Sequence, residues 1–157
     1  MSNLVVFFSR DGHTEKVTEA LAEKIDADKE SIKESGSREG VIGWIRSGYE
    51  SARGKTPPIK DLDVDPGVYD LVVVGTPVWA GTLASPVRSF LDKYGSEIQK
   101  VGFFCTMGGD DPAGTFEEMQ ELCGKPPVAV AGYKSKDVDD DSYLGNLDIF
   151  IEKLVKD

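Results

Sequence analysis

The chain has 157 residues, of which 39% are hydrophobic and 29% are charged, so it is long enough to bury a core and does not have the composition of a disordered protein. Its formal net charge of −10 disfavours nucleic acids and anionic lipids as partners, because phosphate contacts require clustered lysine and arginine. The two cysteines, Cys105 and Cys123, fit neither a disulfide framework nor a zinc site, and their apolar surroundings predict buried thiols in a reducing compartment.

The N-terminal apolar run, Leu4–Phe8, is too short for the core of a signal peptide or for a membrane span. Together with the reduced cysteines, this run leads us to expect a cytoplasmic protein whose residues 1–157 form a single domain. The run shows little alternation of polarity, which predicts a strand buried on both faces.

Further runs downstream have the same short, β-branched or aromatic character. They are Leu71–Gly75, Val101–Cys105 and Val128–Tyr133, and a weaker strand is expected near Glu30–Glu34. Runs of this kind are typical of parallel sheets that are covered by helices.

Amphipathic segments between the runs predict helices. The first is Thr14–Ile25. The second is Ser85–Tyr94, where Ser85 can cap the helix, Pro86 suits the first helical position and Gly95 ends it.

A third helix is expected to start after Asp111-Pro112 and to stop at Gly124. The last helix is expected to begin at Ser142, with its inward face formed by Leu144, Leu147, Ile151 and Leu154. Strands that alternate with helices imply right-handed βαβ units, and therefore an α/β fold with one open parallel sheet.

The segment Gly40–Lys55 places Trp44, Ile45, Tyr49 and Ala52 on one helical face. We interpret it as a helix that covers the sheet. The alternative is that Trp44 and Tyr49 reach a ligand or a second subunit.

In an open parallel sheet, ligands bind beyond the carboxyl ends of the strands. Four polar loops are expected to meet there: Ser9–Thr14, Thr76–Gly81, Thr106–Pro112 and Lys134–Ser142. The first loop, SRDGHT, leads from a strand into a helix, so its backbone N–H groups and the helix dipole suit a phosphate. The alternative is a plain strand-to-helix turn that is capped by Asp11 or Thr14.

Known phosphate-binding motifs limit the class of ligand that the first loop can bind. Neither G-x-G-x-x-G nor G-x-x-x-x-G-K-[ST] occurs in the first loop, which favours one small phosphate over a pyrophosphate. In the second loop Trp79 offers a flat surface to a ring, or alternatively anchors a dimer, and Gly81 allows close approach of the backbone. Gly108-Gly109 in the third loop would present bare backbone to the same ligand.

A phosphate loop after the first strand, an aromatic loop after the third and a glycine-rich loop after the fourth together resemble the flavodoxin family. The similarity runs from Leu4 to the last helix. Within the family, SRDGHT is more similar to the loop of the menaquinone-type protoporphyrinogen oxidases and small flavodoxin-like proteins than to that of short-chain flavodoxins. The resemblance implies a three-layer flavodoxin-like fold, with a five-stranded parallel sheet of order 2-1-3-4-5 and helices on both faces, and one non-covalent FMN.

The resemblance also implies which residues hold the cofactor. The residues expected at the phosphate are Ser9, Arg10, Asp11, Gly12, His13 and Thr14. One side of the isoalloxazine is expected to meet Pro77, Val78, Trp79, Ala80 and Gly81. Its other side or its pyrimidine edge is expected to meet Thr106, Met107, Gly108 and Gly109.

Three features depart from the family pattern. The third loop, TMGGDD, has no aromatic residue where many flavodoxins stack a tyrosine, which leaves room for a substrate or a partner. Arg10 and His13 bring charge to a loop that is often neutral, and we assign His13 to phosphate binding rather than to proton donation. Gly40–Lys55 is not expected of a minimal electron carrier.

The resemblance implies an FMN-binding redox protein, and our leading interpretation is a low-potential carrier that passes electrons one at a time and uses no catalytic side chain and no metal. Acidic residues in the loops at the ligand edge indicate a redox partner with a basic docking face, and the chain itself is expected to be a monomer or homodimer. The alternative is an FMN-dependent oxidoreductase that acts on a quinone or a porphyrinogen-type substrate.

Two other classes are excluded by single positions. A response-regulator receiver needs a phosphate-accepting Asp after the third strand, which here reads VVVGTPVW. A phosphatase of the Cys-x5-Arg kind needs an arginine six positions after its cysteine, and no arginine occupies that position after Cys105.

Overall fold

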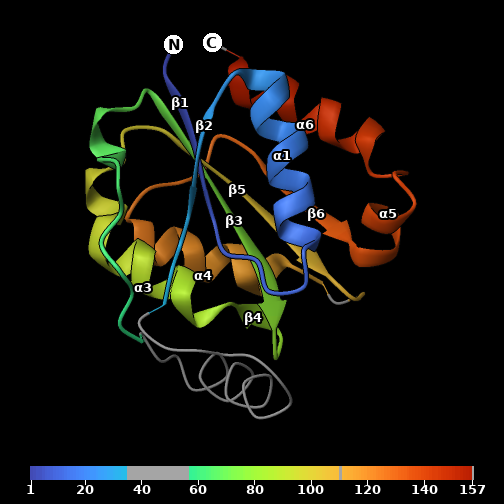
Figure 1. The fold of residues 1–157 in the computed structure, drawn as a ribbon, viewed down its shortest axis with the longest axis horizontal. Coiled ribbons are helices and arrows are strands. Elements are labelled where there is room, and N and C mark those ends of the chain that lie inside the picture. The colour runs from blue at the N-terminus through green and yellow to red at the C-terminus, as the bar shows by residue number, and fades with distance from the viewer. Residues whose placement is uncertain (35–56, 110, 157) are drawn as a thin grey trace.

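The computed structural model of the chain describes residues 1–34, 57–109 and 111–156. The segment Gly40–Lys55, with Trp44 and Tyr49, lies outside the described residues. The main strands are β1 (Asn3–Phe7), β2 (Asp28–Ser31), β3 (Leu71–Trp79), β5 (Val101–Met107) and β6 (Val130–Lys134). They pair in parallel in the order β2-β1-β3-β5-β6 (Figure 1), which confirms the expected order 2-1-3-4-5.

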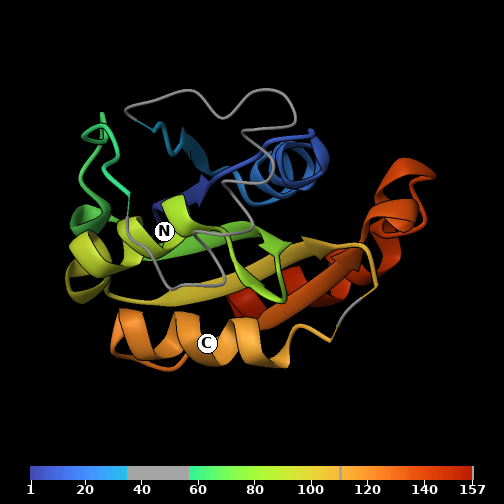
Figure 2. The same ribbon diagram turned by 90° about the horizontal axis from the view of Figure 1, so that it is seen from below.

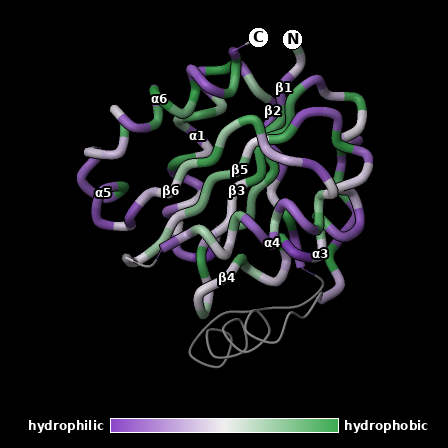
Figure 3. Tube along the Cα trace, turned by 180° about the vertical axis from the view of Figure 1, so that it is seen from behind, coloured by the Kyte–Doolittle hydropathy of each residue, from purple (hydrophilic) through white to green (hydrophobic). Residues whose placement is uncertain are grey.

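Helices cover both faces of this twisted sheet (Figure 2). The helices are α1 (His13–Ile25), α3 (Ser85–Tyr94), α4 (Ala113–Cys123), α5 (Ser135–Asp139) and α6 (Leu144–Val155), with short 3-10 turns at Pro66–Val68 and Gly95–Glu97. One hydrophobic cluster joins the sheet to α3 and α4, and the other joins it to α1, α5 and α6. Hydrophobic residues follow the central strands β1, β3 and β5, whereas α5 is largely hydrophilic (Figure 3).

The two clusters share the central strands by alternation. Val6 and Val74 pack toward α3 and α4, whereas Val5 and Val73 pack toward α1 and α6. Successive side chains of a strand point to opposite faces, so a strand that is covered on both sides must be apolar throughout. This confirms the interpretation of the uniformly apolar runs at β1 and β3.

The third strand is longer than predicted. β1 pairs with β3 only as far as Gly75, while β3 continues to Trp79 beside β5 and then pairs with a short antiparallel strand, β4 (Thr82–Leu83). Pro77 is accommodated because β1 has already ended on that side, so the missing N–H breaks no bond to β1. The prediction of a loop at Thr76–Gly81 was therefore wrong for its first four residues.

Only Ala80 and Gly81 form the turn between β3 and β4. Their φ angles are 52° and 81°, and a two-residue hairpin turn of type I′ requires positive φ at both central positions. Glycine adopts such an angle freely, whereas alanine does not.

Two expectations at the C-terminal end were also wrong. The fourth predicted loop, Lys134–Ser142, contains the short helix α5. The run Val128–Tyr133 is not buried on both faces, because β6 is the last strand in the sheet order and both Val128 and Val130 are exposed.

Helix ends follow the sequence signals in part. Gly124, at φ 80°, ends α4 as predicted, and Gly95 follows the last residue of α3. However, the N-cap of α3 is Ala84 rather than Ser85, and the Ala84 N–H donates to the Thr76 hydroxyl at 3.0 Å.

The last helix begins at Leu144 rather than at Ser142. Leu144 itself is exposed, and Phe150 joins Leu147 and Leu154 on the buried face. None of the helices in the described part of the chain has the length and apolar character needed to cross a membrane.

The cysteines lie in the core, as the sequence predicted. Cys105 and Cys123 are free thiols that are almost completely buried. Burial raises the pKa of the Cys105 thiol to about 12 and also raises that of Cys123, so both are unreactive structural residues.

Candidate functional site

The segments that follow the parallel strands meet at one edge of the sheet, as expected. The Phe8 ring, just after β1, packs edge-on against the Trp79 ring at the end of β3, with 5.4 Å between their centroids. The Thr14 hydroxyl lies 2.8 Å from the Thr106 hydroxyl of β5. The bond between Thr14 and Thr106 therefore joins the first predicted loop to the third, and the residue just before the first loop contacts the second.

The fourth segment joins them through α5. The Ser135 hydroxyl donates to the backbone carbonyl of Met107 at the end of β5, at 3.2 Å. The Nε2 atom of His13 lies 2.9 Å from Oδ1 of Asp139. These contacts bring all four strand ends to one edge, where the topology of an open α/β sheet places a ligand site.

The first loop turns sharply at Gly12, the N-cap of α1. Its φ angle of 97° is one that residues with a Cβ rarely adopt. Within the described residues, the backbone N–H groups of Gly12 and Thr14 have no hydrogen-bond partner, whereas that of Glu15 donates to the Ser9 hydroxyl at 3.2 Å. Free N–H groups at a helix N-terminus are donors for an anion.

Thr14 differs from the expectation in its orientation. Its side chain is fully buried, and its hydroxyl is bonded to Thr106. The hydroxyl therefore ties α1 to β5, and the contribution that Thr14 offers to a phosphate is its backbone N–H. Neither Asp11 nor Thr14 is the N-cap, although Asp11 accepts a hydrogen bond from the backbone N–H of His13 at 3.2 Å.

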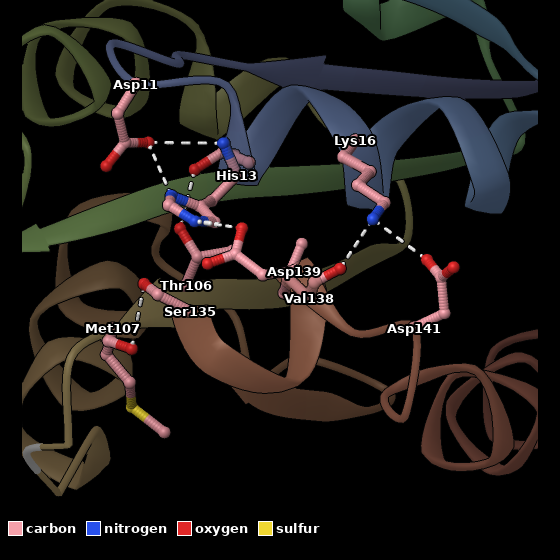
Figure 4. A network of polar contacts seen from close by, with 10 residues as sticks. Asp11, His13, Lys16, Thr106, Met107, Ser135, Val138, Asp139 and Asp141 are labelled. Atoms are coloured by element: carbon pink, nitrogen blue, oxygen red, sulfur yellow. Dashed lines mark hydrogen bonds and ion pairs between the residues drawn. The ribbon is translucent and has the colours of Figure 1, made fainter.

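His13, the first residue of α1, lies between two carboxylates (Figure 4). Its Nδ1 is 3.0 Å from Asp11 Oδ1, and its Nε2 is 2.9 Å from Asp139 Oδ1. Burial alone would lower the pKa of His13, but the two carboxylates outweigh it and raise the pKa above 6.5. The imidazolium form is therefore favoured at the first turn of the helix.

The turn between β3 and β4 is anchored from behind by an ion pair. The Arg88 Nε donates to Glu118 Oε2 at 2.6 Å, and the Thr82 hydroxyl donates to Glu118 Oε1 at 2.5 Å. Burial would raise the pKa of Glu118, but the bonds from Arg88 and Thr82 outweigh it and lower the pKa. Trp79, next to the turn, is only partly buried and thus keeps some surface at the edge of the sheet.

The third loop presents backbone rather than side chains. Gly108 and Gly109 are exposed, and a Cβ added at either would meet nothing within 4 Å. The same holds for Gly81 on the other side of the site. These open glycines leave space for a ligand to approach the main chain closely.

Two contributors to this edge were missed by the sequence interpretation. Asp139 was seen only as part of an acidic loop, and Glu118 was not singled out at all. Asp139 is 126 positions from the histidine that it contacts, and Glu118 is 30 from its arginine. No local pattern in the sequence marks either pairing.

Comparisons with known proteins agree with this architecture. The family described as Flavodoxin matches residues 2–135 of the chain. Two curated relatives are each described as NAD(P)H dehydrogenase (quinone). The one from Cupriavidus metallidurans is 30% identical over 92 residues, which cover 59% of this chain and 46% of the relative. The one from Rhodopseudomonas palustris is 28% identical over 106 residues, which cover 68% and 53%. The chain thus spans about half the length of these relatives.

Solved structures match over nearly the whole chain. A flavoprotein from Lactobacillus acidophilus NCFM, crystallised in complex with FMN, has a TM-score of 0.73 at 25% identity and covers 94% of this chain and 98% of its own. A flavoprotein from Bacteroides eggerthii has a TM-score of 0.76 at 22% identity and covers 96% and 98%, which shows the fold. The fold, the glycine-turned first loop and the family match together show that this chain belongs to the flavodoxin family.

Proposed function

We propose that this chain is a redox protein that binds one FMN without a covalent bond at the carboxyl edge of its sheet. The observation that carries the proposal is the meeting of four strand-end segments around a helix N-terminus with free backbone donors. FMN is also the group bound by the Lactobacillus acidophilus flavoprotein, which resembles this chain over almost its full length.

The described residues fit such a group. The N–H groups of Gly12 and Thr14 and the Ser9 hydroxyl supply donors for one phosphate, and the cationic form of His13 adds a positive charge beside them, with Arg10 in the same loop. We assign two groups of residues to the two sides of the flavin ring. One side has the partly buried indole of Trp79 and its neighbours Pro77, Val78, Ala80 and Gly81, and the other has Thr106, Met107, Gly108 and Gly109.

The flavin, when bound, supplies the capacity to accept and release one or two electrons. The chain's own part is to bind the phosphate, to hold the ring between the β3–β4 turn and the third loop, and to keep water from one of its faces. We assign no catalytic side chain and no metal to this task.

The leading role is that of a low-potential electron carrier in the cytoplasm. Exposed carboxylates at the site, such as Asp11 and Asp139, oppose additional negative charge on a reduced cofactor, which lowers its potential. The same acidic edge would attract a redox partner with a basic docking face.

A second role is that of an oxidoreductase with a quinone or porphyrinogen-type substrate. The specific observation in its favour is that both curated relatives are described as NAD(P)H dehydrogenase (quinone). The third loop, which lacks an aromatic residue and has exposed glycines, leaves room for such a substrate.

The test is a visible absorption spectrum of the purified protein after FMN is added and the excess removed, followed through stepwise anaerobic reduction. Reduction in two resolved one-electron steps supports the carrier. Reduction in one two-electron step, with turnover of NAD(P)H and a quinone, supports the oxidoreductase. A protein that retains no flavin contradicts both roles.

A further inference from the structure

We propose that Asp139 of α5 is a positioning residue of the first loop: it holds the His13 ring through Nε2 and thereby makes binding of the flavin phosphate depend on the protonation of this histidine. The inference rests on the proposed function. It names the group that regulates the affinity of that site.

Asp139 lies on α5, a short helix that several contacts fix in place. Val138, the residue before it, is fully buried, and Ser135 at the start of α5 donates to the backbone of β5. Lys16, one turn into α1, donates to the Val138 carbonyl at 2.6 Å and pairs with Asp141 at 2.8 Å (Figure 4). The short helix α5 is therefore clamped to the first turn of α1, so that Asp139 meets His13 in a fixed place.

The two carboxylates beside His13 favour one protonation state of its ring. The imidazolium can donate from Nε2 to Asp139 and carries the positive charge that pairs with Asp11 across 3.0 Å, whereas a neutral imidazole carries no charge for either carboxylate. Asp11 also accepts from the backbone N–H of His13, so the same carboxylate contacts the ring and the helix start. Loss of the ring proton removes the positive charge that both carboxylates face.

The charge balance links this contact to the phosphate. With His13 protonated, the group of His13, Asp11 and Asp139 carries a net charge of about −1, and with His13 neutral about −2. A phosphate monoester adds roughly −1.5 to −2 at neutral pH. Its affinity should therefore decrease as the pH rises through the pKa of His13, which the two carboxylates raise above 6.5.

The other charged groups near this contact do not replace the histidine. The pairing with Asp141 raises the pKa of Lys16, so Lys16 stays cationic across the range in question. Asp137 and Asp140 are engaged by Ser142. The remaining charged side chains on the loop and the two helices near His13 are Arg10, Glu15 and Lys136.

The experiment uses the fact that the chain has a single histidine. Proton NMR of its ring gives one titration curve, recorded on flavin-free protein for the wild type, Asp139→Asn and the matched control Asp141→Asn. Asp139→Asn should move the midpoint to lower pH, because it removes one of the two stabilising carboxylates. Asp141→Asn should leave the midpoint in place, because it keeps the bond from Lys16 to the Val138 carbonyl that holds α5 on α1.

FMN affinity is then measured by fluorescence quenching from about pH 6.5 to 9. The wild type should lose about fivefold in affinity across its own NMR midpoint, the scale of one unit charge acting across a few ångströms near water. Asp139→Asn should show the decrease at lower pH, and His13→Gln should show none.

An NMR midpoint that is equal in Asp139→Asn and the wild type would overturn the inference. So would FMN affinity that stays constant across the wild-type midpoint, while the proposed function would survive. A protein that binds no FMN at any pH would overturn the proposed function and the inference with it.

Discussion

At the scale of single residues, Ala80 is held in a conformation that alanine rarely adopts. Its φ of 52° in the β3–β4 turn costs about 1–2 kcal/mol relative to ordinary backbone. Gly81, the other residue of the turn, has φ 81° without the same penalty. The turn therefore stores strain at one position, beside the surface that we assign to the flavin ring.

Replacing Ala80 by asparagine should stabilise the protein by about 0.5–1 kcal/mol, because Asn-Gly is the preferred pair for a type I′ turn. The matched change Gly81→Ala should destabilise it by about 1–2 kcal/mol. Since a Cβ at Gly81 meets nothing within 4 Å, the second effect isolates backbone strain from crowding. Urea unfolding of the flavin-free protein measures both changes, and a stabilised Gly81→Ala variant would contradict this account of the turn.

At the scale of elements, the buried bond between Thr14 and Thr106 fixes α1 on the sheet. Both side chains are almost completely buried, and their hydroxyls are 2.8 Å apart. The bond joins the first turn of α1 to the strand that carries the third loop. It therefore sets the distance between the segment that we assign to the phosphate and one that we assign to the ring.

Thr14→Val or Thr106→Val alone should each destabilise the protein by about 1–3 kcal/mol, because each leaves the partner hydroxyl buried without a bond. The double variant should cost less than the sum of the two, since both polar groups are then gone. Chemical unfolding of the four proteins gives the coupling energy. Strictly additive losses would show that the two hydroxyls do not depend on each other.

The same scale shows which elements a sequence can predict. β1 and α1 were predicted within one residue because their apolar patterns are strong and their ends carry turn residues. The end of β3 was mistaken for a loop because Pro77 disfavours a strand, and only the neighbouring strands show that this position is tolerated there. The exposure of Val130 could not be predicted, because an edge position is a property of the sheet order.

The candidate site was predictable in outline but not in its contacts. The four strand ends follow from the topology alone, and they do meet. In contrast, α5 was missed because its five residues have little apolar periodicity, and its place depends on tertiary contacts of Ser135 and Val138. The pairing of Asp139 with His13 has no local signal and appears only when the two helices are packed together.

At the scale of the whole molecule, the net charge of −10 should control how fast a basic partner associates. The screening length shrinks from about 30 Å at 0.01 M salt to about 8 Å at 0.15 M salt, so attraction over long distances is lost in this range. Stopped-flow electron transfer from the reduced FMN-loaded protein to a basic haem protein should therefore slow steeply as salt is added.

An acidic haem protein of similar potential serves as the control and should show a rate that is constant or increases with salt. A rate of electron transfer to the basic protein that does not change with ionic strength would contradict electrostatic steering.

β1 lies between β2 and β3, and very different numbers of residues separate it from these two strands in the sequence. Its pairing with β2 spans only α1, whereas the contacts beside β3 join Ser2 to Asp70, which are 68 positions apart. Closing so long a segment costs entropy before its contacts stabilise anything, and parallel pairing between distant strands is correspondingly slow. We therefore expect β1, α1 and β2 to form first and β3 afterwards, so that the first loop takes its shape before the turn at Ala80 and Gly81 exists.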